Sequence, residues 1–277
     1  MLGVSPAYFV SMYGAHFGPR ETAMGLGALS DIGYASFQAE VFSPETLGSW
    51  TPSSIRELRA EASAHGLACG AFVAHFLGRP MAELGYARVL ELMDQAERSL
   101  AAAAELGCRG PWTLPLTAPR AGTEAPALEE LLAALAERCA AYGFDLSVEL
   151  MPGNVLGGLA EFIGLASKPG FEALTLLLDT GHLWVMGEDL SRLPDGLAGK
   201  IGAVHLCDND GVVNLSLPPG RGTIPFRRVI PELGRLGFDG PLDIEVVCPE
   251  DQALIAYAEA FEAVSSIVRR RERPIPA

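Results

Sequence analysis

The chain has 277 residues, of which 49% are hydrophobic and 19% charged, and its formal net charge is −14. This apolar content is enough for a large folded core and excludes a disordered chain, while the acidic charge argues against nucleic acid as a partner. Five dispersed cysteines without a CxxC pair favour reduced thiols and a cytoplasmic location, and the lack of an uninterrupted apolar run of about 18 residues predicts no membrane span.

One pattern recurs along the chain, in which a helical segment ends at a glycine and a short apolar run follows. The joints are DIGYASF, AHGLACGAF, ELGCRGPW, AYGFDLSV and KPGFEALTLLL. Glycine just past a helix end favours the left-handed turn that closes the helix, and a short apolar run is typical of a strand buried on both faces. Helical periodicity is clearest over Ser53–Ala64, Met81–Leu106, Leu128–Tyr142 and Phe226–Leu236. Eight predicted strands end near Val10, Phe42, His75, Pro115, Leu150, Asp179, Leu206 and Val247.

Eight strands that each precede a helical segment predict an α/β fold, a single (β/α)8 TIM barrel. The alternative is an open doubly wound sheet, which normally carries a glycine-rich phosphate-binding turn after an early strand. The chain contains neither GxGxxG nor a P-loop motif, and no linker or composition shift marks a second domain. Residues 1–277 are therefore expected to form one barrel domain, with a C-terminal helix and a short basic tail near residues 269–277.

Polar residues occur where the later strands are predicted to end. Glu149 closes the fifth strand, Asp179 the sixth and His205 the seventh, and Glu245 lies in the eighth, LDIEVV. The carboxyl ends of all strands of a (β/α)8 barrel meet at one rim, where the active site lies. These four side chains are therefore expected to lie together.

A cluster of carboxylates at the ends of apolar strands needs a counter-charge, because an unpaired ionised group is costly there. The only lysines, Lys168 and Lys200, precede strands, and no predicted strand end carries an arginine. Carboxylate and imidazole ligands suit Mn²⁺, Mg²⁺, Co²⁺ or Zn²⁺. We therefore predict a divalent metal held by Glu149, Asp179, His205 and Glu245. The lack of a strand-end lysine also excludes a Schiff-base aldolase.

Other residues near this rim are candidates for binding a substrate. They are Glu40, His75, Asp208, Arg221, Trp112 and Trp184. Four of them have a second interpretation: Glu40 in a salt bridge, His75 as a buried hydrogen-bonded histidine, and the two tryptophans packing without a ligand rather than against a sugar face.

Five segments resemble the xylose isomerase-like barrel superfamily, which includes sugar isomerases and epimerases, inosose dehydratases and endonucleases of the endonuclease IV type. The segments are VELMPG, LLLDTGHLW, AVHLCDN, PPGRGTIPF and LDIEVV, and the resemblance is strongest from Asp145 to Val247. The ketose 3-epimerases carry an arginine soon after the seventh-strand histidine, whereas this chain has CDNDGVVN there. Arg221, sixteen residues past His205, is the candidate replacement.

The resemblance implies roles for individual residues. Glu149 and Glu245 correspond to glutamates that bind the metal and move a proton, and Asp179 and His205 to the remaining ligands. His182 corresponds to a histidine that contacts substrate hydroxyls or a second metal, and the turn Pro219–Gly222 to the lining of the substrate mouth.

The expected function is a metal-dependent sugar isomerase or epimerase that removes a proton next to the carbonyl of a sugar, keto-sugar or cyclitol. An inosose-type dehydratase and a non-catalytic sugar- or metal-binding barrel subunit are the alternatives. The expected partner is a small-molecule sugar or polyol, with no membrane contact and with a homo-oligomer left open.

Overall fold

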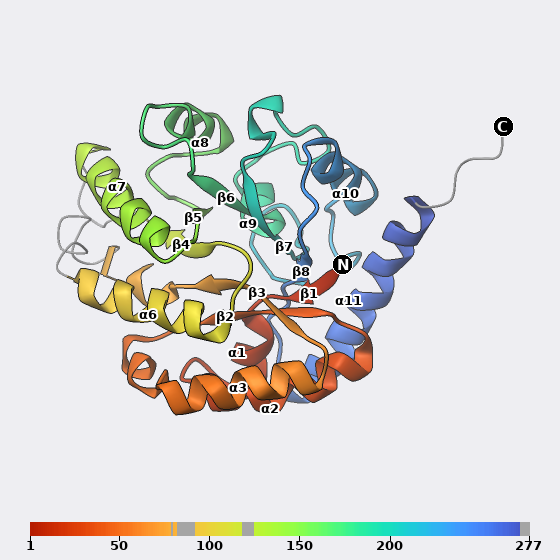
Figure 1. The fold of residues 1–277 in the computed structure, drawn as a ribbon. Coiled ribbons are helices and arrows are strands. Elements are labelled where there is room, and N and C mark those ends of the chain that lie inside the picture. Colours follow the sequence, from red (N-terminus) through yellow and green to blue (C-terminus); the bar gives the residue numbers. More distant parts are fainter. Residues whose placement is uncertain (79, 82–91, 118–124, 272–277) are drawn as a thin grey trace.

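The computed structural model describes residues 1–277 except residues 79, 82–91, 118–124 and 272–277. Its centre is a closed barrel of eight parallel strands in chain order, which confirms the predicted (β/α)8 fold (Figure 1). The strands are β1 (Leu2–Val4), β2 (Ser36–Glu40), β3 (Ala68–Val73), β4 (Trp112–Leu116), β5 (Leu146–Leu150), β6 (Thr175–Asp179), β7 (Ile201–Leu206) and β8 (Leu242–Ile244).

Helices surround the barrel on its outside, as Figure 1 shows. The α-helices are α1 (Ala7–Tyr13), α2 (Pro19–Ile32), α3 (Pro52–Ala64), α6 (Met93–Leu106), α7 (Ala125–Ala141), α8 (Leu159–Ala166), α9 (Thr180–Val185), α10 (Phe226–Arg235) and α11 (Glu250–Arg271). Short 3₁₀ helices are η1 (Pro44–Ser49), η2 (His75–Leu77) and η4 (Asp195–Leu197). In the part of the chain that is described, no helix has both the length and the apolar character needed to cross a bilayer.

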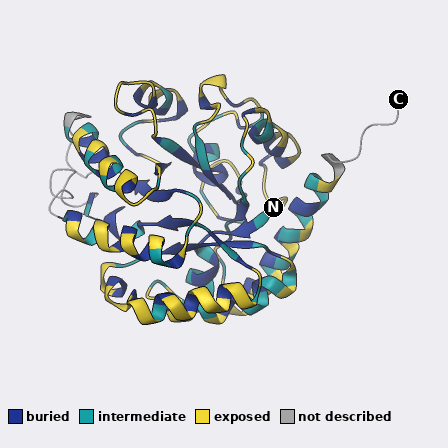
Figure 2. Cartoon of the chain, viewed as in Figure 1, coloured by how far each residue is buried: buried dark blue, intermediate teal, exposed yellow. Residues whose placement is uncertain are grey.

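The glycines predicted to end helices have the expected conformation. Gly33 after α2 and Gly107 after α6 are left-handed, with φ of 112° and 83°, and the N–H of each closes the last helical turn. The strands that follow are largely buried, and β2, β4 and β5 are buried at every position (Figure 2). The helices in Figure 2 bury one face and expose the other, so the core lies inside the barrel and beneath the helices.

Two element boundaries differ from the predictions. Val10, near which the first strand was predicted to end, lies in helix α1, and the strand itself is Leu2–Val4. A short apolar run does not distinguish a strand from a buried helix, and Pro6 directly before α1 suits a helix start because it lacks an N–H to donate. Of the helix predicted over Met81–Leu106, the structure describes α6 from Met93, and residues 82–91 lie outside the described residues. Residues 272–277 of the predicted basic tail also lie outside them.

Candidate active site

A cavity of about 300 Å³ opens at the carboxyl ends of the strands. Its polar lining includes Glu40, His75, Glu149, His182, His205 and Glu245. A separate cavity of about 230 Å³ lies at the opposite, amino-terminal end of the barrel and is lined by none of the predicted site residues. Since barrel enzymes use the carboxyl end, the first cavity is the candidate active site.

The predicted metal ligands converge on one atom, Nδ1 of His205. This nitrogen lies 2.8 Å from Glu245 Oε2, 3.7 Å from Glu149 Oε1 and 3.8 Å from Asp179 Oδ2. All four side chains are buried or nearly so, because each lies on or just after a strand whose other residues form the barrel core.

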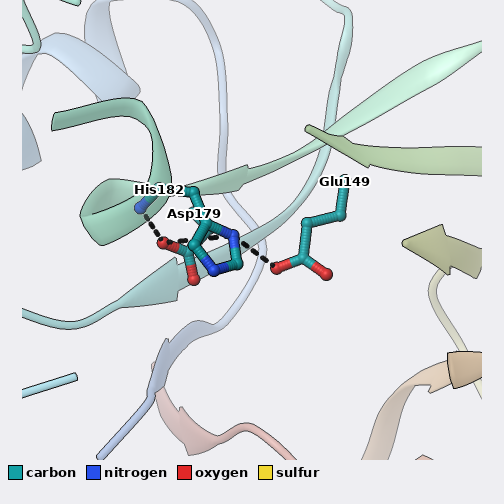
Figure 3. A group of neighbouring side chains, drawn as sticks. All are labelled: Glu149, Asp179 and His182. Atoms are coloured by element: carbon teal, nitrogen blue, oxygen red, sulfur yellow. Dashed lines mark hydrogen bonds and ion pairs between the residues drawn. The ribbon is translucent and has the colours of Figure 1, made fainter. Parts of the chain in front are cut away.

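His182 joins this group from the helix that follows β6. Asp179 Oδ1 accepts a hydrogen bond of 2.7 Å from the His182 backbone N–H, which caps the start of α9. The His182 ring then lies between two carboxylates, with Nδ1 3.4 Å from Glu149 Oε1 and 3.9 Å from Asp179 Oδ1 (Figure 3). His182, predicted to contact substrate, is therefore also placed as a potential ligand.

The charges of the group depend strongly on one another. Burial raises the pKa of Asp179 to about 6. Burial lowers the pKa of His182, but Asp179 and Glu149 outweigh it and raise that pKa to about 10. The pKa of His205 is likewise well above its usual range, since Glu245 and Glu149 outweigh its burial. Burial raises the pKa values of Glu149 and Glu245, yet the two histidines lower them overall, so both carboxylates are ionised at neutral pH.

The donor atoms suit a divalent cation. Glu149, Asp179 and His182 each offer a ligand atom within 4.8 Å of the others, and a second such group joins Asp179 to Cys207 and Glu245. The Nδ1 atoms of His182 and His205 are buried without a hydrogen-bond partner in the described structure. Both nitrogens face carboxylate oxygens, His182 Nδ1 at 3.4 Å from Glu149 and His205 Nδ1 at 2.8 Å from Glu245, and imidazole nitrogens and carboxylate oxygens grouped in this way suit metal coordination.

Glu40 and His75 form the opposite wall of the same cavity. His75 Nδ1 lies 3.4 Å from Glu40 Oε1, and the His75 ring stacks on Phe42 at a centroid distance of 4.3 Å. Burial raises the pKa of Glu40 in spite of His75, and Glu40 Oε2 has no hydrogen-bond partner in the described structure. These two residues therefore have polar atoms available to a ligand, in addition to the ion pair that was the alternative interpretation.

Asp208 occupies a different environment from the one predicted for it. Its fully buried carboxylate accepts hydrogen bonds from the backbone N–H groups of Asn209, Gly220, Gly222 and Ile224. All four donors belong to the loop between β7 and α10, so Asp208 holds the predicted mouth turn in place and leaves no free oxygen for a substrate.

Three other predicted substrate contacts also lie away from the cavity lining. Trp112 begins β4 at the amino-terminal end of the barrel, where its fully buried ring donates a hydrogen bond to Ser99 of α6. Trp184 Nε1 donates to Thr223 Oγ1 at 2.9 Å. Arg221 points outward and pairs with Glu259 of α11 at 2.7 Å. A tryptophan in a strand can lie near either end of the strand, and its ring can face either side of the sheet. The spacing of residues along the chain does not decide between these positions.

The structure adds polar residues that sequence reasoning missed. Gln38 and Asp243 are buried inside the barrel, and Asn214 and Ser216 line the cavity. The sequence does contain a pattern that points to Gln38 and Asp243. Gln38 lies two residues before Glu40, and Asp243 lies two residues before Glu245. Because side chains alternate along a strand, residues two apart face the same side.

The barrel and its rim define a (β/α)8 protein with a carboxylate–histidine site of the kind that metal-dependent enzymes use. A family model described as xylose isomerase-like TIM barrel matches residues 26–266. The chain therefore belongs to the xylose isomerase-like TIM barrel family, as the five motifs indicated.

Individual relatives are more distant. A fructoselysine 3-epimerase of Shigella flexneri is 26% identical over 150 residues, which is 53% of this chain and 54% of that protein, so the match spans about half of each. A solved structure of L-ribulose 3-epimerase has a TM-score of 0.73, 19% identity and coverage of 99% of both chains. The IOLI protein, solved with a binding zinc atom, has a TM-score of 0.73 and 15% identity over 97% of this chain and 96% of that one. Identities this low show a shared fold.

Proposed function

We propose that the protein is a metal-dependent sugar isomerase or epimerase that removes a proton from the carbon next to a carbonyl. The observation that carries this proposal is the position of two ionised glutamates in one cavity. Glu149 from β5 and Glu245 from just after β8 both face His205, 3.7 Å and 2.8 Å from its Nδ1. Proton removal from one face of a carbon and proton return to its opposite face use two such groups around one substrate.

Glu149, Asp179, His205 and Glu245 would hold the metal, with His182 beside them. A divalent cation there supplies a Lewis acid that polarises a sugar carbonyl. The zinc atom of the IOLI structure, a protein of the same fold, supports this proposal.

The residues of this chain supply the proton chemistry. One of the two glutamates takes the proton from the carbon beside the carbonyl. The other returns a proton to the opposite face of that carbon, which gives an epimer, or to the neighbouring carbon, which gives an isomer. His182, held by Glu149 and by the Asp179 cap, orients the substrate hydroxyls. Glu40 and His75 contact the far end of the sugar.

The cavity favours an unphosphorylated sugar or keto-sugar. Its described lining carries acidic and histidine side chains and, within that described part, no lysine or arginine. Phosphate groups are usually bound by such cations or by helix starts. The names of the similar proteins, a fructoselysine 3-epimerase and an L-ribulose 3-epimerase, point to the same substrate class.

The test begins with metal analysis of the purified protein, followed by incubation in D₂O with ketoses, keto-sugars and inososes. NMR then follows deuterium uptake at the carbon beside the carbonyl. Uptake together with a new sugar supports an isomerase or epimerase, whereas loss of water identifies a dehydratase. A metal-loaded protein that binds sugars of the panel but exchanges no deuterium would be a binding protein, and the proposal would be wrong.

A further inference from the structure

A buried chain of hydrogen bonds leads from β8 to the candidate metal site and has no part in the proposed proton transfers. The Gln38 amide Nε2 donates to Asp243 Oδ2 at 2.7 Å, and the Gln38 amide oxygen lies 3.0 Å from His205 Nε2. Gln38 is fully buried, and Asp243 and His205 are 2% and 3% exposed. Polar groups buried this deeply have to be satisfied within the protein.

The chemistry of these groups sets the direction of each hydrogen bond. An ionised carboxylate can only accept, so the NH₂ of Gln38 faces Asp243 and its oxygen faces His205. His205 Nε2 must then carry a proton. In the metal-bound form the imidazole would be neutral, and with its proton on Nε2 its lone pair is on Nδ1, which is the atom that faces Glu149, Asp179 and Glu245.

The strand arrangement brings these residues together. His205 and Asp243 are paired in the register of β7 and β8, while β1 separates β8 from β2. Gly3 of β1 pairs with Asp243 on one side and with Ser36 on the other. A side chain at Gly3 would collide with Asp243 Oδ1 and Ser36 Oγ. Glycine at this position thus lets Asp243 reach across β1 toward Gln38.

We propose that Gln38 and Asp243 are positioning residues that hold the His205 ring with its Nε2 proton toward Gln38 and its Nδ1 toward the metal. This inference rests on the proposed metal-dependent function. Metal-binding histidines commonly donate their second ring N–H to a carboxylate or carbonyl, which fixes the ring and strengthens the ligand. Here the amide of Gln38 is that acceptor, and Asp243 fixes the amide.

Zinc binding and ring N–H exchange test this assignment. The variant Gln38→Leu removes the acceptor at similar size, so Zn²⁺ affinity, measured by competition with a chromogenic chelator, should fall about 10- to 100-fold. NMR of ¹⁵N-histidine-labelled, Zn²⁺-loaded protein should show faster exchange of the His205 Nε2 proton. The variant Gln38→Glu keeps an oxygen toward His205, and its carboxyl can share a proton with Asp243. It should therefore retain both wild-type properties.

The same measurements separate this inference from the proposed function. A wild type that binds no Zn²⁺, but whose protected Nε2 proton is lost in Gln38→Leu, would refute the metal and keep the ring assignment. Zn²⁺ affinity within threefold of wild type in Gln38→Leu, with an equally protected N–H, overturns the positioning role. Loss of affinity in both Gln38 variants with unchanged N–H protection also overturns it, because the effect would then not act through the ring.

A second observation is independent of the metal site. Cys69 at the start of β3 and Cys108, which follows the end of α6, have their Sγ atoms 2.7 Å apart at the amino-terminal end of the barrel. An S–S bond is about 2.05 Å long, so small movements would join them. Cys69 is buried and Cys108 half-buried, which leaves Cys108 the more accessible of the two.

We infer that Cys69 and Cys108 form a disulfide when exposed to a low-molecular-weight disulfide oxidant. The Cys108 thiolate attacks the oxidant and releases one thiol, and the Cys69 thiolate then displaces the second thiol from the mixed disulfide. The two protons leave with the two released thiols. Burial raises the pKa of the Cys108 thiol well above its usual range, so the reaction should be slow at neutral pH.

Peptide mapping by mass spectrometry tests this pair after the full chain is incubated with oxidised glutathione at mildly alkaline pH. The expected product is a Cys69–Cys108 cross-linked peptide two hydrogen atoms lighter than the reduced pair, with a raised melting temperature because the bond closes a long loop. The variant Cys108→Ser should lose the cross-link, and Cys248→Ser, which removes the other half-buried thiol, should keep it. A stable glutathione adduct on Cys108 without the cross-link, or two unmodified thiols, overturns the assignment.

Discussion

The variant Asp208→Asn tests whether this buried carboxylate holds the mouth loop. Asp208 Oδ2 accepts two bonds of 2.8 Å from the N–H groups of Gly220 and Gly222, and Oδ1 accepts those of Asn209 and Ile224. An asparagine has only one acceptor oxygen. Whichever way the amide turns, two of the four N–H groups lose their partner and face an NH₂ donor.

The loss of unfolding free energy in Asp208→Asn follows from the two hydrogen bonds that the variant cannot make. Hydrogen bonds to a charged group contribute about 1.5–3 kcal/mol each, which gives an upper range of about 3–6 kcal/mol. Gly220 and Gly222 are exposed, so their N–H groups can turn to water, and we expect a net loss of about 2 kcal/mol. For a domain of this size that lowers the melting temperature by about 4–8 °C.

Asp210 provides a matched control in the same loop. Its single oxygen Oδ1 accepts from Val212 and Val213 N–H at 2.8 and 2.9 Å in an exposed position, so asparagine can make the same bonds. Thermal unfolding followed by circular dichroism should show Asp208→Asn shifted and Asp210→Asn unchanged. Equal melting temperatures for Asp208→Asn and wild type would refute the reasoning.

Three further outcomes are expected. Glu149→Gln and Glu245→Gln should each lower deuterium uptake about 10²- to 10⁴-fold in the NMR assay, while Glu130→Gln on the surface of α7 leaves it unchanged. Adding a chelator to a preparation shown to contain metal should lower the melting temperature of the wild type. The Asp179→Asn variant should show a smaller difference in melting temperature between samples with and without chelator. Burial raises the pKa of Asp243 to about 6. The neutral Asp243 carboxyl therefore stabilises the folded protein fully below about pH 4, and this stabilisation is lost as the pH rises through 6. Asp243→Asn should therefore gain about 2 kcal/mol relative to wild type between pH 4 and 7 in urea unfolding.

The repeating pattern of glycine joints and apolar runs was enough to predict the barrel. Glycines such as Gly33 and Gly107 end helices for a local reason, the left-handed turn, and continuous apolar runs have no stable place except inside a sheet covered on both faces. Local rules failed at the first strand, where the run containing Val10 is equally compatible with a buried helix.

The convergence of Glu149, Asp179, His205 and Glu245 could also be predicted, since strand ends of a parallel barrel share one rim. Position on the rim does not fix the direction of a side chain, however. Asp208 turns into its own loop and Arg221 outward to Glu259. Those directions depend on partners that lie far along the chain.

Only the tertiary structure could decide the contacts between strands distant in sequence. Gln38 meets Asp243 because the barrel closes β1 against β8 and Gly3 leaves room between them. Cys69 and Cys108, separated by 39 positions, are brought together by the return of α6 to the sheet. Apart from the first strand, the sequence by itself determined where the strands lie and which polar groups end them. Which of those groups touch was decided by closure of the barrel, because hydrogen bonds and thiol contacts act over a few ångströms and spacing along the chain does not specify distance in space.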